Sequence, residues 1–387
     1  MSTSSQVGFK LAHHCLFAFT AFVILALSYR FFVVDMVDYL PVSRVTIPDS
    51  EYYTVFANEE FAANGFAAFE GRKNYFFPTM LAYSVRNIAY GDLLLNSIFV
   101  GLIAVTLVRL LAAYRCTNPL PIYFTLLNPE TIYYAQGFLK EIPSLFAFVL
   151  FLYALKRKRW SVLGFSIVLA LTIRFQLGAI LLALASLQFI PRRSRGFAVG
   201  TVVAGIVAAA PVIYQYAFAE DVAAAAVFRS ESPGFGIGAM LEQGMLNVPF
   251  AGLFIAPLRA VQNLLEPWPH VAVFDATGAI NVYDCVLAAT AVIMVPFYVR
   301  FIFLAVQQVA HLCNASRFPE TPQSISPVLF ALLLATLNPF IHHRYVYFCS
   351  TLLCVTSCVE PSGWTLWQKQ CSVVIMFIFC AAAMVSI

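Results

Sequence analysis

Long apolar runs separated by short polar segments recur along this chain from one end to the other. A helix that crosses a membrane needs about 20 consecutive, mostly apolar residues, so the pattern predicts an all-α polytopic membrane protein. We expect about 11 transmembrane helices, within a range of about 9 to 12. The predicted spans are residues 11–34, 92–114, 118–136, 141–155, 161–173, 175–190, 197–218, 281–304, 325–341, 345–358 and 371–387.

Two basic clusters, Lys156–Arg159 and Arg192–Arg195, orient these spans, because Lys and Arg are enriched on the cytoplasmic side of a membrane. One straight helix through the residues between them would be about 48 Å long and would put the clusters on opposite sides. We therefore predict two short helices that turn near Arg174 at the outer surface. The amino terminus is then cytoplasmic and the carboxyl terminus extracytoplasmic.

The acidic residues are distributed unevenly on this map. All of the 19 Asp and Glu residues except Glu320 and Glu360 lie on the extracytoplasmic side or at that end of a span. Acidic residues contribute little to membrane orientation, so the skew needs another cause. We interpret it as an outward-facing polar reaction chamber.

Composition excludes several other classes of protein. The chain is 61% hydrophobic and 11% charged, whereas about 25% of the residues of a soluble domain are charged. Its mean hydropathy is +0.81. The net charge of +4 is too small to indicate a nucleic-acid partner. The nine cysteines follow no paired spacing, so we interpret them as small buried apolar residues.

We expect one membrane-embedded domain, residues 1–387, with two long extracytoplasmic segments at residues 35–91 and 219–280. Both segments are rich in aromatic residues and amphipathic stretches, which is typical of helices that lie in the membrane interface. The first contains a helix-like stretch that ends at Asn64-Gly65. Membrane lipids are therefore expected partners.

Asp49 and Glu51 follow the first span at a turn that Pro48 begins. In an extended backbone, residues two apart project to the same side, so the two carboxylates would lie close together. Such a pair can act as a general base, bind a divalent cation or form a solvated loop face. We interpret it as catalytic, with a divalent cation at Asp49 and Glu51 as the one candidate cofactor.

Two basic side chains near predicted span ends are candidate phosphate ligands. Lys140 precedes Glu141 at the start of the fourth span, where the two could instead form an interfacial ion pair. Arg174, with Gln176 nearby, lies at the tip of the predicted hairpin. A charge there needs a partner, either a phosphate or an acid such as Glu130.

The remaining candidates lie further along the chain. His343 and Arg344 are placed where the ninth and tenth spans meet outside. Arg344 is an anion contact or part of an aromatic belt, and no metal site is predicted because adjacent histidines project in different directions. Arg259 and Glu266 flank an apolar turn in the second long segment, where they bind substrate or form a helix-surface pair.

The order of several motifs resembles a known family. In chain order they are a first span, Asp49-Ser50-Glu51-Tyr52-Tyr53, Asn64-Gly65, Phe77-Pro78, Gly91-Asp92 and a span that carries Asn96. This order resembles the start of GT-C-fold integral membrane glycosyltransferases. It is most similar to the glycosyltransferase family 39 group, which includes protein O-mannosyltransferases and lipid A aminoarabinose transferases.

The Leu139-Lys140-Glu141 helix start, the Arg174 hairpin and Arg344-Tyr345 also look like this type of bacterial membrane protein. The resemblance covers about residues 1–190, and the remainder only loosely. Two features depart from it. Ser50 separates acids that are adjacent in many relatives, and no soluble carboxyl-terminal domain is evident.

The resemblance implies a polyprenyl-phosphate sugar donor and a hydroxyl acceptor on a glycan, lipid or protein. Asp49 or Glu51 would activate the acceptor, and the anomeric centre would be inverted. Lys140, Arg174 and Arg344 would stabilise the phosphate leaving group. The expected location is a bacterial cytoplasmic membrane, with the active site facing outward and a role in polysaccharide biosynthesis.

Two other functions stay open. A Wzy-type polysaccharide polymerase or ligase, acting on lipid-linked oligosaccharide, would depend on the arginines more than on Asp49. A transporter is the second alternative. The apparent lack of acids inside the spans and of a repeat argues against it.

Overall fold

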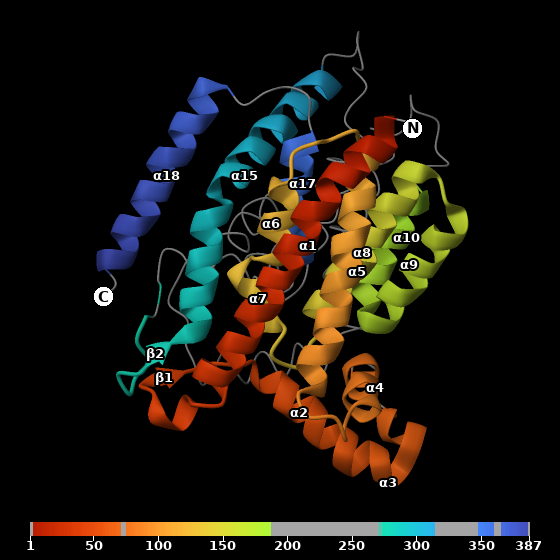
Figure 1. Cartoon of the computed structure of the whole chain (residues 1–387), viewed down its shortest axis with the longest axis vertical. Helices are drawn as coiled ribbons and strands as arrows, with labels where there is room; N and C mark the ends of the chain where they lie inside the picture. The colour runs from red at the N-terminus through yellow and green to blue at the C-terminus, as the bar shows by residue number, and fades with distance from the viewer. Residues whose placement is uncertain are drawn as a thin grey trace, which may run out of the picture.

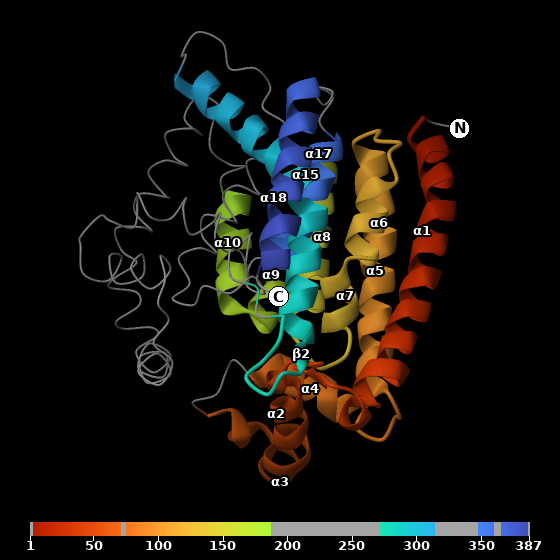
Figure 2. The ribbon, with the colours of Figure 1, turned by 90° about the vertical axis from the view of Figure 1, so that its left-hand side faces the viewer.

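The structure is a computed structural model that describes residues 3–70, 75–186, 271, 273–313, 347–359 and 365–385. These residues are mostly helical and form a bundle of long helices (Figure 1). Short helices α2 to α4 gather at one end of the bundle, opposite the amino terminus (Figure 2). The described part therefore consists of a bundle of long helices and a small group of short helices, α2 to α4, at one end.

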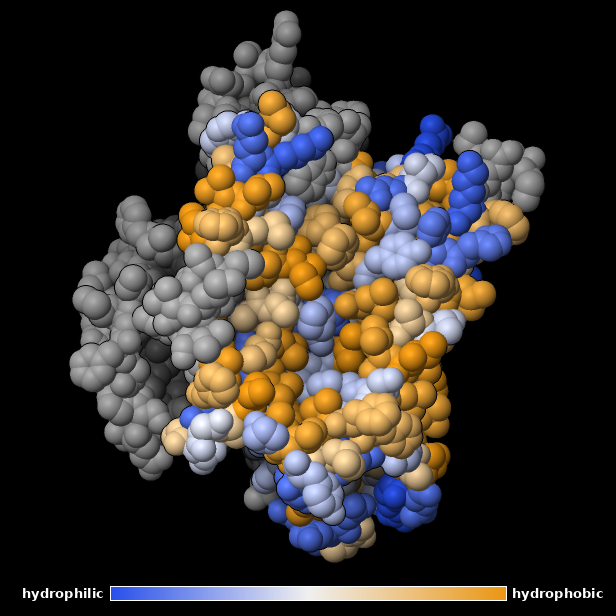
Figure 3. Space-filling model, turned by 60° about the vertical axis from the view of Figure 1, so that its left-hand side comes forward, coloured by the Kyte–Doolittle hydropathy of each residue, from blue (hydrophilic) through white to orange (hydrophobic). Residues whose placement is uncertain are grey.

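Three helices are long and apolar enough to cross a membrane, namely Val7–Val34, Gly91–Ala113 and Val282–Leu304. Shorter apolar helices include Trp160–Ile173 and Leu366–Ile378. Figure 3 shows a wide hydrophobic zone between two more hydrophilic ends. These features indicate a membrane protein, while the total of about 11 spans stays a prediction.

Helix α8 (Glu141–Arg157) lies inside the bundle and packs against α5 (Gly91–Ala113), while α1 (Thr3–Tyr29) lies at the outer edge (Figure 2). Helix α1 continues as a π-helical stretch, Arg30–Val34, and α5 packs against both α1 and α8. Helix α8 is buried along most of its length, as expected for a helix that is apolar on all sides and surrounded by others. It ends at its basic cluster, at the opposite end from Lys140.

The hairpin predicted from the two basic clusters is confirmed. Helix α9 (Trp160–Ile173) and helix α10 (Phe175–Ser186) are separated by Arg174, whose backbone is extended at φ −147° and ψ 113°. The two helices pack closely at Gly178, where an added Cβ would overlap Leu171. Arg174 therefore lies at the turn.

The span predicted at residues 118–136 is wrong as one continuous helix. The structure has two short helices, α6 (Leu120–Leu126) and α7 (Pro129–Tyr134), and their break lies part-way along the bundle (Figure 1). The residue before a proline disfavours the α conformation, and Asn128 is accordingly extended and caps α7. We call residues 125–131, with the Thr290 and Tyr347 side chains that contact them, the α6–α7 break.

The first long segment is built from short elements. They are a 3₁₀ turn Val37–Tyr39, β1 (Val42–Ser43), α2 (Pro48–Phe56), a π stretch Ala57–Phe61, α3 (Ala62–Asn64), a 3₁₀ turn Gly65–Phe69 and α4 (Phe76–Ser84). The predicted helix end at Asn64-Gly65 is confirmed, because Gly65 has a φ of 57° that stops α3. Phe56, Phe61 and Phe69 form a separate aromatic core beneath these elements.

The described end of the second long segment contacts the first. Strand β2 (Ile280–Asn281) pairs in parallel with β1, with Val42 opposite Ile280. Helix α15 (Val282–Cys313) follows, and α17 (Tyr347–Val359) and α18 (Leu366–Val385) pack against it. The strand pairing joins two segments that are more than 200 residues apart, which the sequence pattern did not predict.

Candidate functional site

Asp49 and Glu51 lie in the first turn of α2, with Pro48 at its first helical positions. The expectation of an extended pair is therefore wrong, because Pro48 has a φ suited to helix initiation and acids are favoured at a helix N-terminus. In a helix the two side chains are about 200° apart around the axis. Asp49 is half-buried and Glu51 is exposed, so the two carboxylates have different surroundings.

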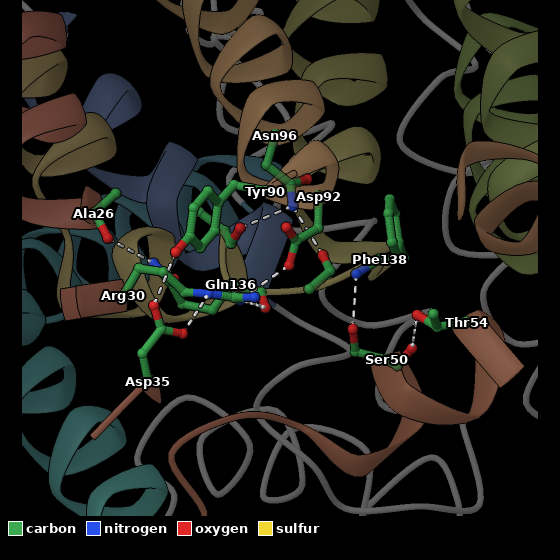
Figure 4. A network of polar contacts seen from close by, with 12 residues as sticks. Ala26, Arg30, Asp35, Ser50, Thr54, Tyr90, Asp92, Asn96, Gln136 and Phe138 are labelled. Carbon is green, nitrogen blue, oxygen red and sulfur yellow. Dashed lines mark hydrogen bonds and ion pairs between the residues drawn. The ribbon is translucent and has the colours of Figure 1, made fainter. Parts of the chain in front are cut away.

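Ser50 attaches α2 to the start of α8. Its Oγ accepts a hydrogen bond from the Phe138 backbone N–H at 2.9 Å (Figure 4). Gly137 makes this contact possible, because a Cβ at that position would overlap the Ser50 side chain. We call residues 49–53 together with 137–141 the α2–α8 junction. It brings Asp49 close in space to a segment almost 90 residues away.

Lys140 belongs to the same junction. It is half-buried and precedes α8, and its Nζ lies 5.7 Å from the centre of the Tyr53 ring. This distance is within cation–π range. Asp49 and Lys140 thus both lie in the two segments that the Ser50–Phe138 hydrogen bond joins.

Glu141, the last residue of the junction, forms an ion pair with Arg174. Arg174 Nη2 and Glu141 Oε1 are 2.5 Å apart, and the exposed fractions of the side chains are 10% and 1%. Glu141 is therefore an acid that Arg174 contacts, whereas the sequence had suggested Glu130 as an example. Removal of either partner of such a pair would leave the other charge buried without compensation.

A network of hydrogen bonds and ion pairs around Arg30 lies next to the junction (Figure 4). Arg30 lies 3.3 Å from Asp35 and 3.1 Å from Asp92, and it also donates to the Gln136 carbonyl. Asn96 donates to the Gly137 carbonyl at 2.8 Å. The backbone carbonyls of Gln136 and Gly137, just before the Phe138 N–H that donates to Ser50, are therefore both held by hydrogen bonds.

Sequence reasoning named Asp92 and Asn96 only as members of a motif and did not single out Arg30. A basic residue at the end of the first apolar run, five residues before Asp35, was the available signal. Its tertiary partner Asp92 could not be read from spacing.

The α6–α7 break holds a second group of polar side chains that the sequence did not reveal. Asn128 Oδ1 accepts hydrogen bonds from the Glu130 N–H and the Thr290 hydroxyl, both at 2.9 Å. Thr131 and Tyr347 share a hydrogen bond of 2.7 Å between their hydroxyls. All five residues are buried, and Glu130 is fully so.

The buried Glu130 corrects one argument made from the sequence. An acid does lie inside a predicted span, at the N-terminal turn of α7 and away from solvent. A proline after Asn128 was the signal of a broken helix, but only packing reveals that the break is enclosed.

The other candidates lie outside what the structure describes. Arg344, His343, Arg259 and Glu266 fall in residues that are not described, and so does most of the second long segment. The backbone of Gln176 is in α10, next to the Arg174 turn, but its side chain is not described. Within the described residues, no group of three or more His, Cys, Asp or Glu side chains could hold a metal ion.

No family model matches the chain, and neither curated proteins nor solved structures give a match.

Proposed function

We propose that this protein transfers a sugar from a polyprenyl-phosphate donor to a hydroxyl acceptor at the membrane surface. The observation that carries the proposal is the α2–α8 junction. A half-buried carboxylate, Asp49, and a half-buried ammonium, Lys140, both belong to this junction, at one end of the helical bundle. A glycosyl phosphate needs a base for the acceptor and a cation for the leaving group, and these two groups supply them.

Asp49 is the proposed base. The acceptor hydroxyl attacks the anomeric carbon, Asp49 takes its proton, and the bond from that carbon to the phosphate oxygen breaks. The polyprenyl phosphate leaves with the electron pair of that bond. Asp49 is preferred to Glu51 because Pro48 and the Ser50 contact hold its position, whereas Glu51 is exposed on another side of α2.

Lys140 is the proposed contact for the leaving phosphate. It lies at the N-terminal end of α8, a helix of 17 residues whose dipole adds positive potential there. Arg174 already faces Glu141, so we propose that it holds the start of α8 in place and reaches the phosphate less directly. Arg344 stays a candidate third cation.

The test compares membranes that contain the unaltered chain with membranes that contain Asp49→Asn. Each receives polyprenyl phosphate carrying a radiolabelled sugar, and label transferred to glycan, lipid or protein is measured. We expect Asp49→Asn to abolish transfer, because an amide cannot accept the proton. The matched control is Glu59→Gln, an exposed acid in the π stretch that follows α2, and it should keep its activity.

Full activity in Asp49→Asn would move the base to Glu51 if Glu51→Gln is inactive. Full activity in both variants would contradict the transferase. A Wzy-type polymerase would lose activity on substitution of its arginines and keep it in Asp49→Asn.

A membrane carrier is the second candidate, because the α6–α7 break favours it. Carriers place binding groups where a membrane helix is interrupted inside the protein, and buried ionisable residues there are often functional. Glu130, fully buried beside Asn128 and Thr131, has this position. Proton uptake into proteoliposomes, lost in Glu130→Gln and kept in Asp49→Asn, would support a carrier.

A further inference from the structure

Three tyrosine rings lie together beside the α2–α8 junction. The ring centres of Tyr52 and Tyr75 are 5.3 Å apart, those of Tyr53 and Tyr75 are 5.6 Å apart, and those of Tyr52 and Tyr53 are 6.4 Å apart. Phe56 supports the group from the aromatic core, at 6.3 Å from Tyr52 and 5.8 Å from Tyr75. The rings are therefore held in place by packing on one side.

The three rings differ in exposure. Tyr53 is buried, whereas 46% of Tyr52 is exposed and Tyr75 is half-buried. Tyrosine suits a site where one side of the ring packs on apolar groups and the other side meets solvent or a ligand. Tyr52 thus presents aromatic surface at the end of the bundle where the Asp49 carboxylate lies.

The charges around the rings indicate what binds there. Tyr53 lies between the exposed ring and a cation, 6.4 Å from Tyr52 and 5.7 Å from the Lys140 ammonium. Asp49 and Glu51 lie in the first turn of α2, the helix that also carries Tyr52 and Tyr53. A ligand with an apolar face, hydroxyl groups and one negative charge complements this set. A glycosyl phosphate has all three features.

We propose that the exposed ring of Tyr52, packed against Tyr75 at an interplanar angle of 57°, is the platform on which the sugar ring of the lipid-linked donor stacks, with its phosphate beside Lys140. The inference rests on the proposed function and adds the part of the site that distinguishes a sugar-bearing lipid from a bare lipid phosphate. The C–H groups on one face of a pyranose carry partial positive charge and pack against the negative face of an aromatic ring. Hydroxyl groups on the ring edge remain available to the carboxylates.

The test measures lipid binding to purified protein in detergent by native mass spectrometry. The probes are polyprenyl phosphate linked to glucose, mannose, galactose or arabinose, and polyprenyl phosphate of the same length without sugar. We expect the unaltered protein to bind at least one sugar-bearing lipid more tightly than the bare lipid. Tyr52→Ala should weaken that binding roughly five- to tenfold and leave the bare lipid unaffected.

Two further variants make the result specific. Tyr52→Phe keeps the ring and should keep the preference for the sugar-bearing lipid. Phe66→Ala removes an exposed ring of the same aromatic core, one that contacts Phe61 and Phe76, and should also keep it. If Tyr52→Ala proves unstable, Tyr52→Leu keeps the apolar volume and removes only the aromatic face.

A preference that survives both Tyr52→Ala and Tyr52→Leu would overturn the platform and leave the proposed function standing. Equal weakening for sugar-bearing and bare lipids would also overturn it, because Tyr52 would then support the fold or the lipid chain. Failure of the unaltered protein to bind any of these lipids would overturn the proposed function together with the platform.

Discussion

The α2–α8 junction and the α6–α7 break both bring carboxylates and hydroxyl groups together, but they differ in access. At the junction, Glu51 is exposed and Asp49 and Lys140 are half-buried, so a solute from outside can reach them. At the break, Glu130 and Thr131 are buried beneath packed helices. The comparison shows that the position of an acidic residue along the sequence does not tell whether a solute can reach it. Burial in the folded bundle decides that.

The two regions are also held differently. At the junction, the Ser50–Phe138 hydrogen bond requires the absence of a Cβ at Gly137. The break depends on Asn128, which accepts two hydrogen bonds inside the bundle. Four predictions, ordered from the largest expected effect to the smallest, test this contrast.

The largest effect is expected from Arg174→Ala. It leaves the buried Glu141 carboxylate without the Arg174 charge, and removal of one partner of such a pair costs about 3–5 kcal/mol. Thermal and chemical unfolding in detergent should show this loss, and Arg174→Lys should lose less because it keeps the charge. Binding of polyprenyl phosphate should persist in the folded fraction.

The opposite result, weak lipid binding at near-normal stability, would make Arg174 a direct phosphate ligand. Lysine should then replace it poorly, because lysine lacks the planar two-pronged donor. Arg174 would in that case bind substrate directly and would not act only by holding the start of α8 in place.

Gly137→Ala should separate α2 from α8. The new Cβ overlaps Ser50, and such overpacking costs about 1–3 kcal/mol. Transfer activity should fall further than stability does, because the Asp49 position depends on this contact. The double variant with Ser50→Gly should recover stability but not full activity.

A matched control is Gly164→Ala in α9, where nothing lies within 4 Å of the added Cβ. That variant should be neutral or gain up to about 1 kcal/mol from helix propensity. Equal losses in both glycine variants would contradict the close contact at Gly137.

Asn128→Ala tests the break. It removes the cap of α7 and the bond to Thr290, so a loss of about 1–2 kcal/mol is expected. Asn118 accepts the Leu120 N–H in an exposed position before α6, and Asn118→Ala should cost less. Lipid binding should be unchanged in both, and a specific loss in Asn128→Ala would place the substrate at the break.

The smallest effect concerns the contact between the two long segments. The Thr277 hydroxyl and the backbone N–H groups of Thr277 and Ala279 donate hydrogen bonds to Asp275 and, with Ser43 close by, lower its pKa from 3.8 to about 2. The stability from this carboxylate is therefore present above about pH 4 and is lost as the pH falls toward 2.

Hydrogen exchange of the Ile280 N–H, which donates to the Pro41 carbonyl, measures this pairing. Exchange should speed up as the pH falls through that window, after correction for the intrinsic rate. In Asp275→Asn the protection should be lower and should not depend on pH in this range. Identical exchange in the unaltered protein and in Asp275→Asn would show that Asp275 does not hold the two segments together.

Several features followed from local sequence. The turn at Arg174 followed because one helix between the two basic clusters is longer than a bilayer core is thick. The end of α3 at Gly65 followed from the freedom of glycine at positive φ. Asp49 and Lys140 were each named as candidates from sequence, as polar residues beside apolar runs, but their place in one junction was not predicted.

Other features were wrong or missing because they depend on distant partners. The extended form of residues 49–51 was wrong, since Pro48 begins a helix there. The Glu141 partner of Arg174 and the Asp92 partner of Arg30 lie on other helices, and spacing along one chain segment cannot specify them.

The sequence by itself determined that this is a helical membrane protein with charge gathered at particular helix ends, because hydrophobic length and the placement of Lys and Arg act locally. Only the tertiary structure decided which of those charges meet. Ser50 reaches Phe138 because Gly137 has no side chain and Asn96 fixes its carbonyl, and Glu130 is enclosed because α15 and α17 cover the break. Such contacts depend on how the helices pack, and packing is a property of the whole bundle.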